Sequence, residues 1–337
     1  MRGQVSFLLA GVGVLLSGVL AVAVEAPNGE ARKADYQRPQ EVPFPEEDPY
    51  TRAKAELGRA LFFDPILSGS GTHSCATCHN PALSWGDGLP RAIGEKLLAL
   101  RSPTLLNIAW IPVLGWDGKF PDLESVAFAP IGSAANMNRK EADLLAALQA
   151  IPGYRESFAA TFDGGAISRP HIEEALATFE RTIVSGETPF DRWVAGDEAA
   201  IGEPAKRGFA LFTGKAQCAQ CHEGWNFTGG AFYDIGEAAD EDIGRGRIFS
   251  NSLKLQHAFK VPTLRDVARR APYMHDGSVA TLAEVIDLYD RGGIDRPSRS
   301  ELIKPLGLDA REKADLVAFL ETLTAAPASY AVPDLPR

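Results

Sequence analysis

Two copies of one short pattern constrain this chain more than any other feature of its sequence. Residues 75–79 read CATCH and residues 218–222 read CAQCH, so both copies have the form Cys-x-x-Cys-His and together use all four cysteines. Two thiols at this spacing can each add to one vinyl group of a haem, and the histidine that follows can ligate the iron. We therefore predict two covalently attached c-type haems, one at Cys75, Cys78 and His79 and one at Cys218, Cys221 and His222.

Other uses of this pattern fit the sequence less well. Zinc sites built from two Cys-x-x-Cys pairs usually hold the pairs roughly 15–20 residues apart. Here His79 and His222 are 143 residues apart (222 − 79). A thioredoxin-like redox pair would need a βαβ context, which the sequence lacks. Disulfide bonds would leave the histidine at the end of each copy without a role.

The N-terminus has the form of a secretory signal peptide. Arg2 supplies a positive charge, residues 5–24 carry none, and Ala21-Val22-Ala23 is a small-x-small cleavage site. We expect residues 1–26 to be removed on export to the periplasm, leaving an extended arm at residues 27–50 and no membrane span. The alternative is an uncleaved membrane anchor, because about 20 apolar residues can cross a bilayer.

The charge balance excludes one class of partner. The chain has 34 basic and 44 acidic residues, which gives a net charge of −10. Binding to a phosphate backbone needs a basic patch, so we expect no nucleic-acid partner. An acidic chain of this kind suits a soluble protein that meets basic partners.

The chain reads as an internal repeat. Its 337 residues predict two domains at roughly 150 residues each. Similar lead-ins precede the two motifs, GRALFF at residues 58–63 and GFALF at residues 208–212. We therefore predict an N-terminal haem domain at residues 51–197 and a C-terminal haem domain at residues 198–330.

Helical patterns dominate both halves. Ser168 can cap a helix whose apolar stripe runs to Ile183, Thr281 and Glu284 form a capping box, and Asp309 precedes a last amphipathic helix. The chain has no long alternating strands, and Gly- and Pro-rich stretches separate the helices. We expect a mainly α fold with long ordered loops.

From about Ala55 to Leu323 the sequence resembles the bacterial dihaem cytochrome c peroxidases, and in particular their methylamine-utilisation (MauG-like) branch. The segments that carry the resemblance, besides the two motifs, are residues 60–71, 102–104, 115–118, 262–265 and 271–277. The family implies two tandem cytochrome c-like haem domains, with a peroxide haem in the N-terminal domain and an electron-transfer haem in the C-terminal one. It also implies that Trp116 is the tryptophan that bridges the haems.

The resemblance separates two branches at the second haem. Simple peroxidases have a methionine ligand fourteen residues after the histidine that matches His275, whereas the MauG-like branch has tyrosine. Here that position is Tyr289, which the resemblance implies as the second ligand of the C-terminal iron. A phenolate favours ferric iron, while methionine raises the potential. Met274 is the alternative ligand.

The resemblance also bears on the first haem. Where simple peroxidases have a blocking histidine, this chain has Glu95, and residues 80–136 contain no histidine, so the distal side is expected to be open. Pro130 matches the distal proline. Asn136, however, replaces the glutamate that acts as acid–base catalyst, and an amide cannot transfer that proton. Asn136 then works with water, or Glu124 or Glu141 enters the pocket, or the peroxide step is slow.

A calcium ion between the domains is a further expectation from the family. Its carbonyl ligands match Arg270 and Pro272, but its asparagine ligand aligns with Arg101, a poor ligand, with Asn107 nearby.

Three functions follow for a chain of this kind. The first is a peroxidase that reacts with hydrogen peroxide and takes electrons from a small c-type cytochrome or a copper protein. The second is a MauG-like enzyme that oxidises residues of a partner protein. The third is a non-catalytic dihaem electron carrier, in which Met137 could be the sixth ligand of the first haem.

Overall fold

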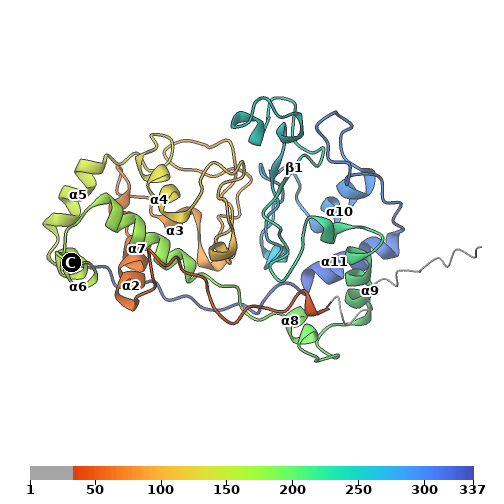
Figure 1. Ribbon diagram of the computed structural model, residues 1–337, viewed down its shortest axis with the longest axis horizontal. Helices are drawn as coiled ribbons and strands as arrows, with labels where there is room; N and C mark the ends of the chain where they lie inside the picture. The colour runs from red at the N-terminus through yellow and green to blue at the C-terminus, as the bar shows by residue number, and fades with distance from the viewer. Residues whose placement is uncertain (1–32) are drawn as a thin grey trace, which may run out of the picture.

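The computed structural model describes residues 33–337, so the predicted signal peptide and the first part of the arm lie outside the described residues. Two lobes lie side by side (Figure 1). Each is built on a pair of packed helices: α2 (Arg52–Phe63) with α7 (Arg169–Arg181), and α9 (Glu203–Thr213) with α11 (Ala310–Glu321). The mainly α fold of two cytochrome c-like domains that the sequence predicted is confirmed.

The remaining elements are short and are joined by long loops. The two strands form an antiparallel pair in which Phe232 faces Lys260 and Tyr233 faces Phe259. Among the described residues, no helix has the length and apolar character needed to cross a membrane. The other helices and the strands are α3 (Cys75–Cys78), α4 (Leu123–Gly132), α5 (Glu141–Ala150), α6 (Pro152–Thr161), α8 (Pro189–Val194), α10 (Leu282–Arg291), β1 (Phe232–Tyr233) and β2 (Phe259–Lys260).

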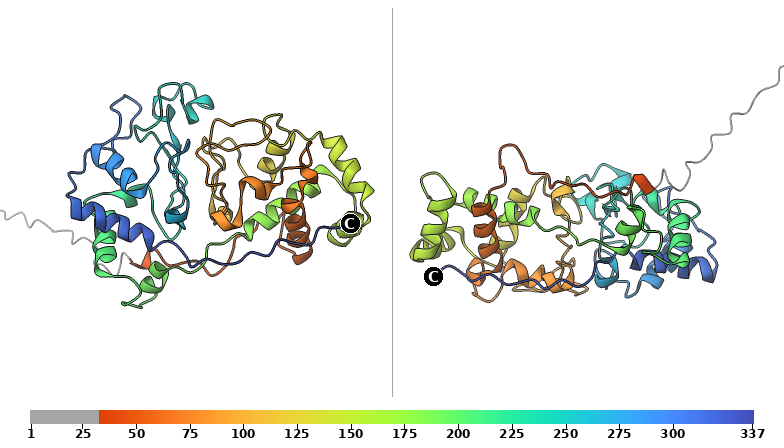
Figure 2. Two further views of the ribbon diagram at one scale, coloured as in Figure 1. Left: turned by 180° about the vertical axis from the view of Figure 1, so that it is seen from behind. Right: turned by 90° about the horizontal axis from the view of Figure 1, so that it is seen from below.

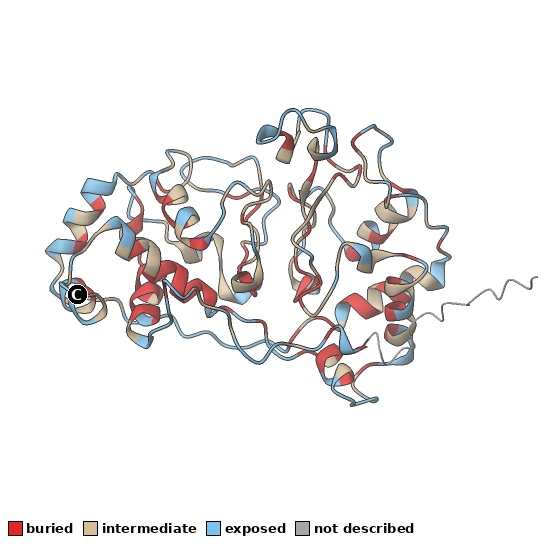
Figure 3. Cartoon of the chain, in the orientation of Figure 1, coloured by how far each residue is buried: buried red, intermediate tan, exposed pale blue. Residues whose placement is uncertain are grey.

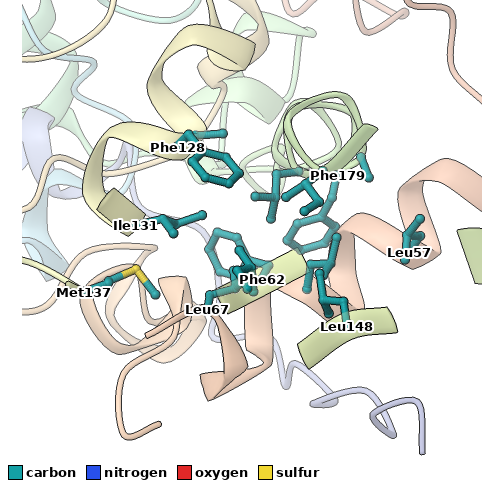
Figure 4. Packing of buried hydrophobic residues seen from close by; sticks show 14 of the residues in the cluster. Leu57, Phe62, Leu67, Phe128, Ile131, Met137, Leu148 and Phe179 are labelled. Carbon is teal, nitrogen blue, oxygen red and sulfur yellow. The ribbon is translucent and has the colours of Figure 1, made fainter. Parts of the chain in front are cut away.

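In each lobe the two packed helices meet at a glycine. A Cβ atom built on Gly58 of α2 would lie 1.8 Å from the carbonyl oxygen of Ala175, and one built on Gly208 of α9 would lie 2.0 Å from that of Asp315. Only glycine permits backbones to approach so closely. The residues around each crossing are buried (Figure 3), and Figure 4 shows how aromatic and aliphatic side chains interdigitate around Phe62 in the first lobe.

Helix starts follow the signals in the sequence. The Ser168 hydroxyl accepts a hydrogen bond from the main chain of α7, and Thr281 and Glu284 form the predicted capping box of α10. Asp309 and Glu312 form another at α11. These caps satisfy main-chain N–H groups that have no partner within the helix.

The repeat extends well beyond the lead-ins. α10 begins 159 positions after α4 (282 − 123). The isolated bridge Tyr273–Val279 likewise lies 159 positions after the bridge Leu114–Phe120. The two lobes therefore contain the same loop-and-helix unit, and each residue from 101 to 132 has a structural equivalent 159 positions later.

The two ends of the described chain tie the lobes together. Tyr36 packs against Phe190 and Phe209 of the second core, before the chain reaches the first lobe. The C-terminal segment runs the other way and ends beside α6, as the views in Figure 2 show. There Tyr330 stacks on Phe63, with 5.5 Å between ring centroids, and Gly153 donates a hydrogen bond to the Arg337 carbonyl.

Candidate active site

One cavity of about 770 Å³ connects the two Cys-x-x-Cys-His motifs. The first motif occupies α3, and the second lies on a 3-10 turn, Cys218–Gln220. The structure thus brings together at one cavity all six residues predicted to attach and ligate the haems, which are Cys75, Cys78, His79, Cys218, Cys221 and His222.

Both motif histidines are oriented as iron ligands would be. Nδ1–H of His79 donates to the Trp85 carbonyl oxygen at 3.3 Å, and Nδ1–H of His222 donates to that of Phe227 at 2.9 Å. Because a carbonyl can only accept, each Nδ1 carries the proton and each Nε2 keeps a lone pair. Burial lowers the pKa of both rings, that of His222 to about 4, so both are neutral at pH 7. This is the state in which imidazole ligates a metal, oriented by a backbone acceptor.

Basic side chains line the same cavity. Burial lowers the pKa of Lys260 to about 8 and, together with the nearby Arg101, that of Arg270 to about 10. The buried Nε of Arg270 has no hydrogen-bond partner among the described residues. Each haem carries two propionate carboxylates, which could pair with such donors. The cavity therefore fits two haems in the chemistry of its walls as well as in its attachment points.

Trp116 lies where the two lobes meet. Its indole Nε1–H donates to the Arg101 carbonyl at 3.0 Å, and its own carbonyl accepts from the main chain of Lys260 at 2.8 Å. Trp116 also lines the cavity. Since Lys260 belongs to the second lobe, the tryptophan is anchored to both, as a bridging residue would need.

Tyr289 and Met274 both reach the cavity. Tyr289 lies on α10 close to Cys218 and Cys221, and burial raises the pKa of its phenol. Met274 directly follows Tyr273, the first residue of the bridge Tyr273–Val279, and has a positive φ of 71°. The structure therefore keeps both residues as candidate ligands of the second iron.

At the first haem motif, Pro130 of α4 and Asn136 of the following loop line the cavity. The Asn136 main chain is fixed, because its N–H donates to Ser133 and its carbonyl accepts from Glu95 at 2.8 Å. Its side chain has no hydrogen bond among the described residues. Met137 is 6% exposed, packs in the first core and also reaches the cavity wall.

The two glutamates proposed as substitutes for the missing acid do not line this cavity. Both Glu124 oxygens accept from Arg181, at 2.6 and 3.0 Å. Glu141 pairs with Arg169 at 3.6 Å, at a separate surface pocket. Those two alternatives are not supported, because each carboxylate is engaged by an arginine elsewhere.

Glu180 was not predicted from the sequence, yet it lies in the cavity wall. The residue is 8% exposed and makes no hydrogen bond or ion pair with its side chain within residues 33–337. Burial raises its pKa to about 8. Glu180 follows Phe179 near the end of α7. Its place in the cavity wall depends on tertiary packing, which no local sequence pattern indicates.

His275 occupies the position equivalent to Trp116 (275 − 116 = 159). Its two ring nitrogens pair with Glu237 at 3.2 Å and Asp242 at 3.0 Å, and its ring stacks on Phe259. Burial alone would lower its pKa, but the bond to Glu237 and nearby carboxylates raise it. Glu237, His275 and Asp276 are spaced so that they could share a metal ion. The contacts with Glu237 and Asp242 give both ring nitrogens of His275 a partner without a metal ion.

The expected calcium ligands do not form an oxygen cage. The Arg270 carbonyl accepts a hydrogen bond from Nη2 of Arg101 at 3.0 Å. The side chain of Asn107 is engaged elsewhere: its oxygen accepts from the main chain of Ser185, and its nitrogen donates to Asn226, both at 2.9 Å. Calcium takes six to eight oxygen ligands, which these residues do not supply.

Comparisons with known proteins agree with this geometry. Residues 52–199 match the family model of the di-haem cytochrome c peroxidases, and residues 205–324 match that of cytochrome c. The methylamine utilization protein MauG of Methylorubrum extorquens is 49% identical, over 95% of this chain and 92% of its own. Cytochrome c551 peroxidase of Nitrosomonas europaea is 34% identical, over 84% of this chain and 83% of its own. A solved MauG-like protein associated with microbial copper homeostasis superposes with a TM-score of 0.78 at 33% identity, over 86% of this chain and 95% of that one.

Proposed function

This chain belongs to the di-haem cytochrome c peroxidase and MauG family, whose members carry two c-type haems. We propose that it is a periplasmic oxidoreductase that uses hydrogen peroxide to oxidise a partner protein. Peroxide is consumed at the N-terminal motif, and electrons enter through the C-terminal one. When bound, the haem irons supply the cleavage of the O–O bond and the storage of oxidising equivalents.

The main support for this proposal is that the cavity differs chemically between its first and its second haem motif. Tyr289 lies beside the second motif, whereas Pro130 and Asn136 lie at the first. A phenol can ligate iron, while proline and an amide leave a site open to a small molecule. The difference supports an open haem at His79 and a closed one at His222.

Trp116 connects the two ends. An indole is among the side chains that lose an electron most easily, and this one is fixed by hydrogen bonds to residues of both lobes. The arrangement supports transfer of single electrons between the haems through Trp116.

The choice of partner rests on the second haem. Tyr289 favours the MauG-like reading, and two relatives, at 49% and 44% identity, are methylamine utilization proteins. We therefore propose oxidation of residues in a partner protein of methylamine utilisation. A small c-type cytochrome or copper protein as electron donor is the second candidate, favoured by the 34% identity to a cytochrome c551 peroxidase.

Proton delivery differs from the family pattern. The Asn136 amide can donate a hydrogen bond to bound peroxide but cannot exchange its proton. Glu180 in the cavity wall is largely protonated at pH 7, because burial raises its pKa to about 8. It is therefore a candidate source of the proton, through water.

The first test is low-temperature EPR of the oxidised dihaem protein before and after one equivalent of peroxide. We expect one high-spin and one low-spin ferric signal, and the loss of both on addition of peroxide. In Trp116→Phe, the low-spin signal should persist for longer. Trp110→Phe is the matched control, because Trp110 packs against Trp225 outside the cavity wall.

The same spectra can refute the proposal. Two low-spin signals that do not respond to peroxide would indicate a dihaem electron carrier. If the signals respond to peroxide, adding reduced cytochrome c then separates the two donors. Rapid oxidation of the cytochrome would favour the peroxidase over the MauG-like enzyme.

A further inference from the structure

Arg101 joins the two lobes through both its backbone and its side chain. Its main-chain N–H donates to the His275 carbonyl, and Nη2–H of its guanidinium donates to the Arg270 carbonyl, each at 3.0 Å. Its own carbonyl accepts the indole proton of Trp116, also at 3.0 Å. The residue is 8% exposed. It therefore fixes the position of Trp116 relative to the second lobe.

The repeat makes this contact reciprocal. Lys260 is the equivalent of Arg101 (260 − 101 = 159), and its main-chain N–H donates to the carbonyl of Trp116, the equivalent of His275, at 2.8 Å. The backbone contacts are thus related by a pseudo-twofold axis. Both side chains also cross the junction, because Lys260 of the second lobe donates to the Val113 carbonyl of the first lobe at 3.0 Å. The acceptors differ, since Val113 is the equivalent of Pro272 (272 − 113 = 159) and not of Arg270, so Arg101 is the side chain that bonds the Arg270 carbonyl.

A metal ion at this junction would meet strong repulsion. The Arg101 guanidinium lies close enough to that of Arg270 to lower its pKa, so the junction already holds two neighbouring positive charges. A divalent cation would add to them at low dielectric constant. The Arg270 carbonyl, which was expected as a calcium ligand, instead accepts a charge-assisted hydrogen bond.

We propose that Arg101 is a built-in cation that replaces a bound calcium ion at the domain junction and acts as the positioning residue for Trp116. The guanidinium takes the place of the ion on the Arg270 carbonyl, so the lobes are held together without metal. The replacement of calcium can be tested whether or not the function proposed above is correct. Only the effect on electron transfer through Trp116 rests on that function.

The first measurement is the calcium content of the dihaem holoprotein, by elemental mass spectrometry after incubation with excess calcium and gel filtration. We expect far less than one ion per chain, and no change in thermal midpoint or EPR spectrum after treatment with EGTA. One ion per chain, whose removal by EGTA changes the spectrum, would overturn the proposal.

The second measurement exchanges the cation. Arg101→Asn removes the guanidinium and supplies an amide oxygen, so this variant should become calcium-dependent. In EGTA, the peroxide-induced loss of its low-spin EPR signal should slow by roughly 10- to 100-fold, because small displacements have effects of that size. Added calcium should restore the rate. Arg101→Lys keeps a positive charge and should stay closer to the parent in EGTA.

Arg91→Asn is the control, since Arg91 lies on the same loop but is exposed, and its side chain bonds only to Leu98 within residues 33–337. It should behave as the parent protein with and without calcium. An Arg101→Asn variant with unchanged kinetics in EGTA would overturn the positioning role. If that variant fails to fold, the calcium content of the parent and the behaviour of Arg101→Lys in EGTA still decide the question.

Discussion

Replacing Glu180 by glutamine should make the protein more stable at alkaline pH. The carboxyl is 8% exposed, lines the cavity and has no side-chain hydrogen bond among the described residues. Burial raises its pKa from 4.5 to about 8. The folded protein therefore keeps this proton over a pH range in which the unfolded chain has lost it.

The sign of the effect follows from proton linkage. Between pH 4.5 and about 8 the folded state binds more protons at Glu180 than the unfolded state, so the free energy of unfolding falls as the pH rises. At 1.36 kcal/mol for each pKa unit, the loss above pH 8 is at most about 5 kcal/mol. Glutamine stays neutral and has nearly the same shape, so Glu180→Gln should match the parent near pH 4.5 and exceed it at pH 8.

Urea unfolding of the dihaem protein at pH 5 and pH 8, followed by far-UV circular dichroism, measures this difference. Glu156→Gln on α6 is the matched control, because Glu156 is exposed and makes no ion pair among the described residues. A stability difference between Glu180→Gln and the parent that is the same at both pH values would refute the assigned burial of the carboxyl.

Four other substitutions have defined outcomes. Gly58→Ala or Gly208→Ala should each destabilise its own lobe by about 1–3 kcal/mol, since the new Cβ would collide with a carbonyl oxygen; unchanged thermal midpoints would contradict the close helix crossing. Tyr289→Met should raise the potential of the C-terminal haem in spectroelectrochemical titration, and an unchanged potential would argue against ligation by Tyr289. Pro130→Tyr places a phenol at the equivalent position of the first lobe and should convert the high-spin EPR signal to low spin; a persistent high-spin signal would show that this position cannot reach the iron.

The haem attachment sites could be predicted because covalent chemistry imposes a local spacing. Each motif needs only five consecutive residues, and its helical turn fixes how they are arranged. Helix starts at Ser168, Thr281 and Asp309 were predictable for the same reason, since each cap side chain accepts from a main-chain N–H only three residues later. The placement of Trp116 and Tyr289 at the cavity came from the family resemblance, and their roles remain predictions.

What the sequence did not reveal depends on contacts between distant segments. Arg101 and Arg270 are 169 residues apart, and nothing local to either predicts that one donates to the other. Glu180 sits on a helix next to Phe179, where a carboxyl among buried residues has no periodic signature. Tyr330 lies in a proline-rich C-terminal segment with no helical or strand pattern, yet it stacks on Phe63 of the other lobe.

The repeat suggests how one scaffold can hold two haems with different tasks. Equivalent residues 159 positions apart share backbone structure: Gly115 and Met274 both have positive φ, of 82° and 71°. The side chains then diverge where chemistry would occur. Pro130 offers no ligand where Tyr289 offers a phenol. Trp116 offers an oxidisable ring where the second lobe has a histidine held between two carboxylates. On our proposal the fold sets the distance between the haems, while these substitutions set which haem meets peroxide and which way electrons move.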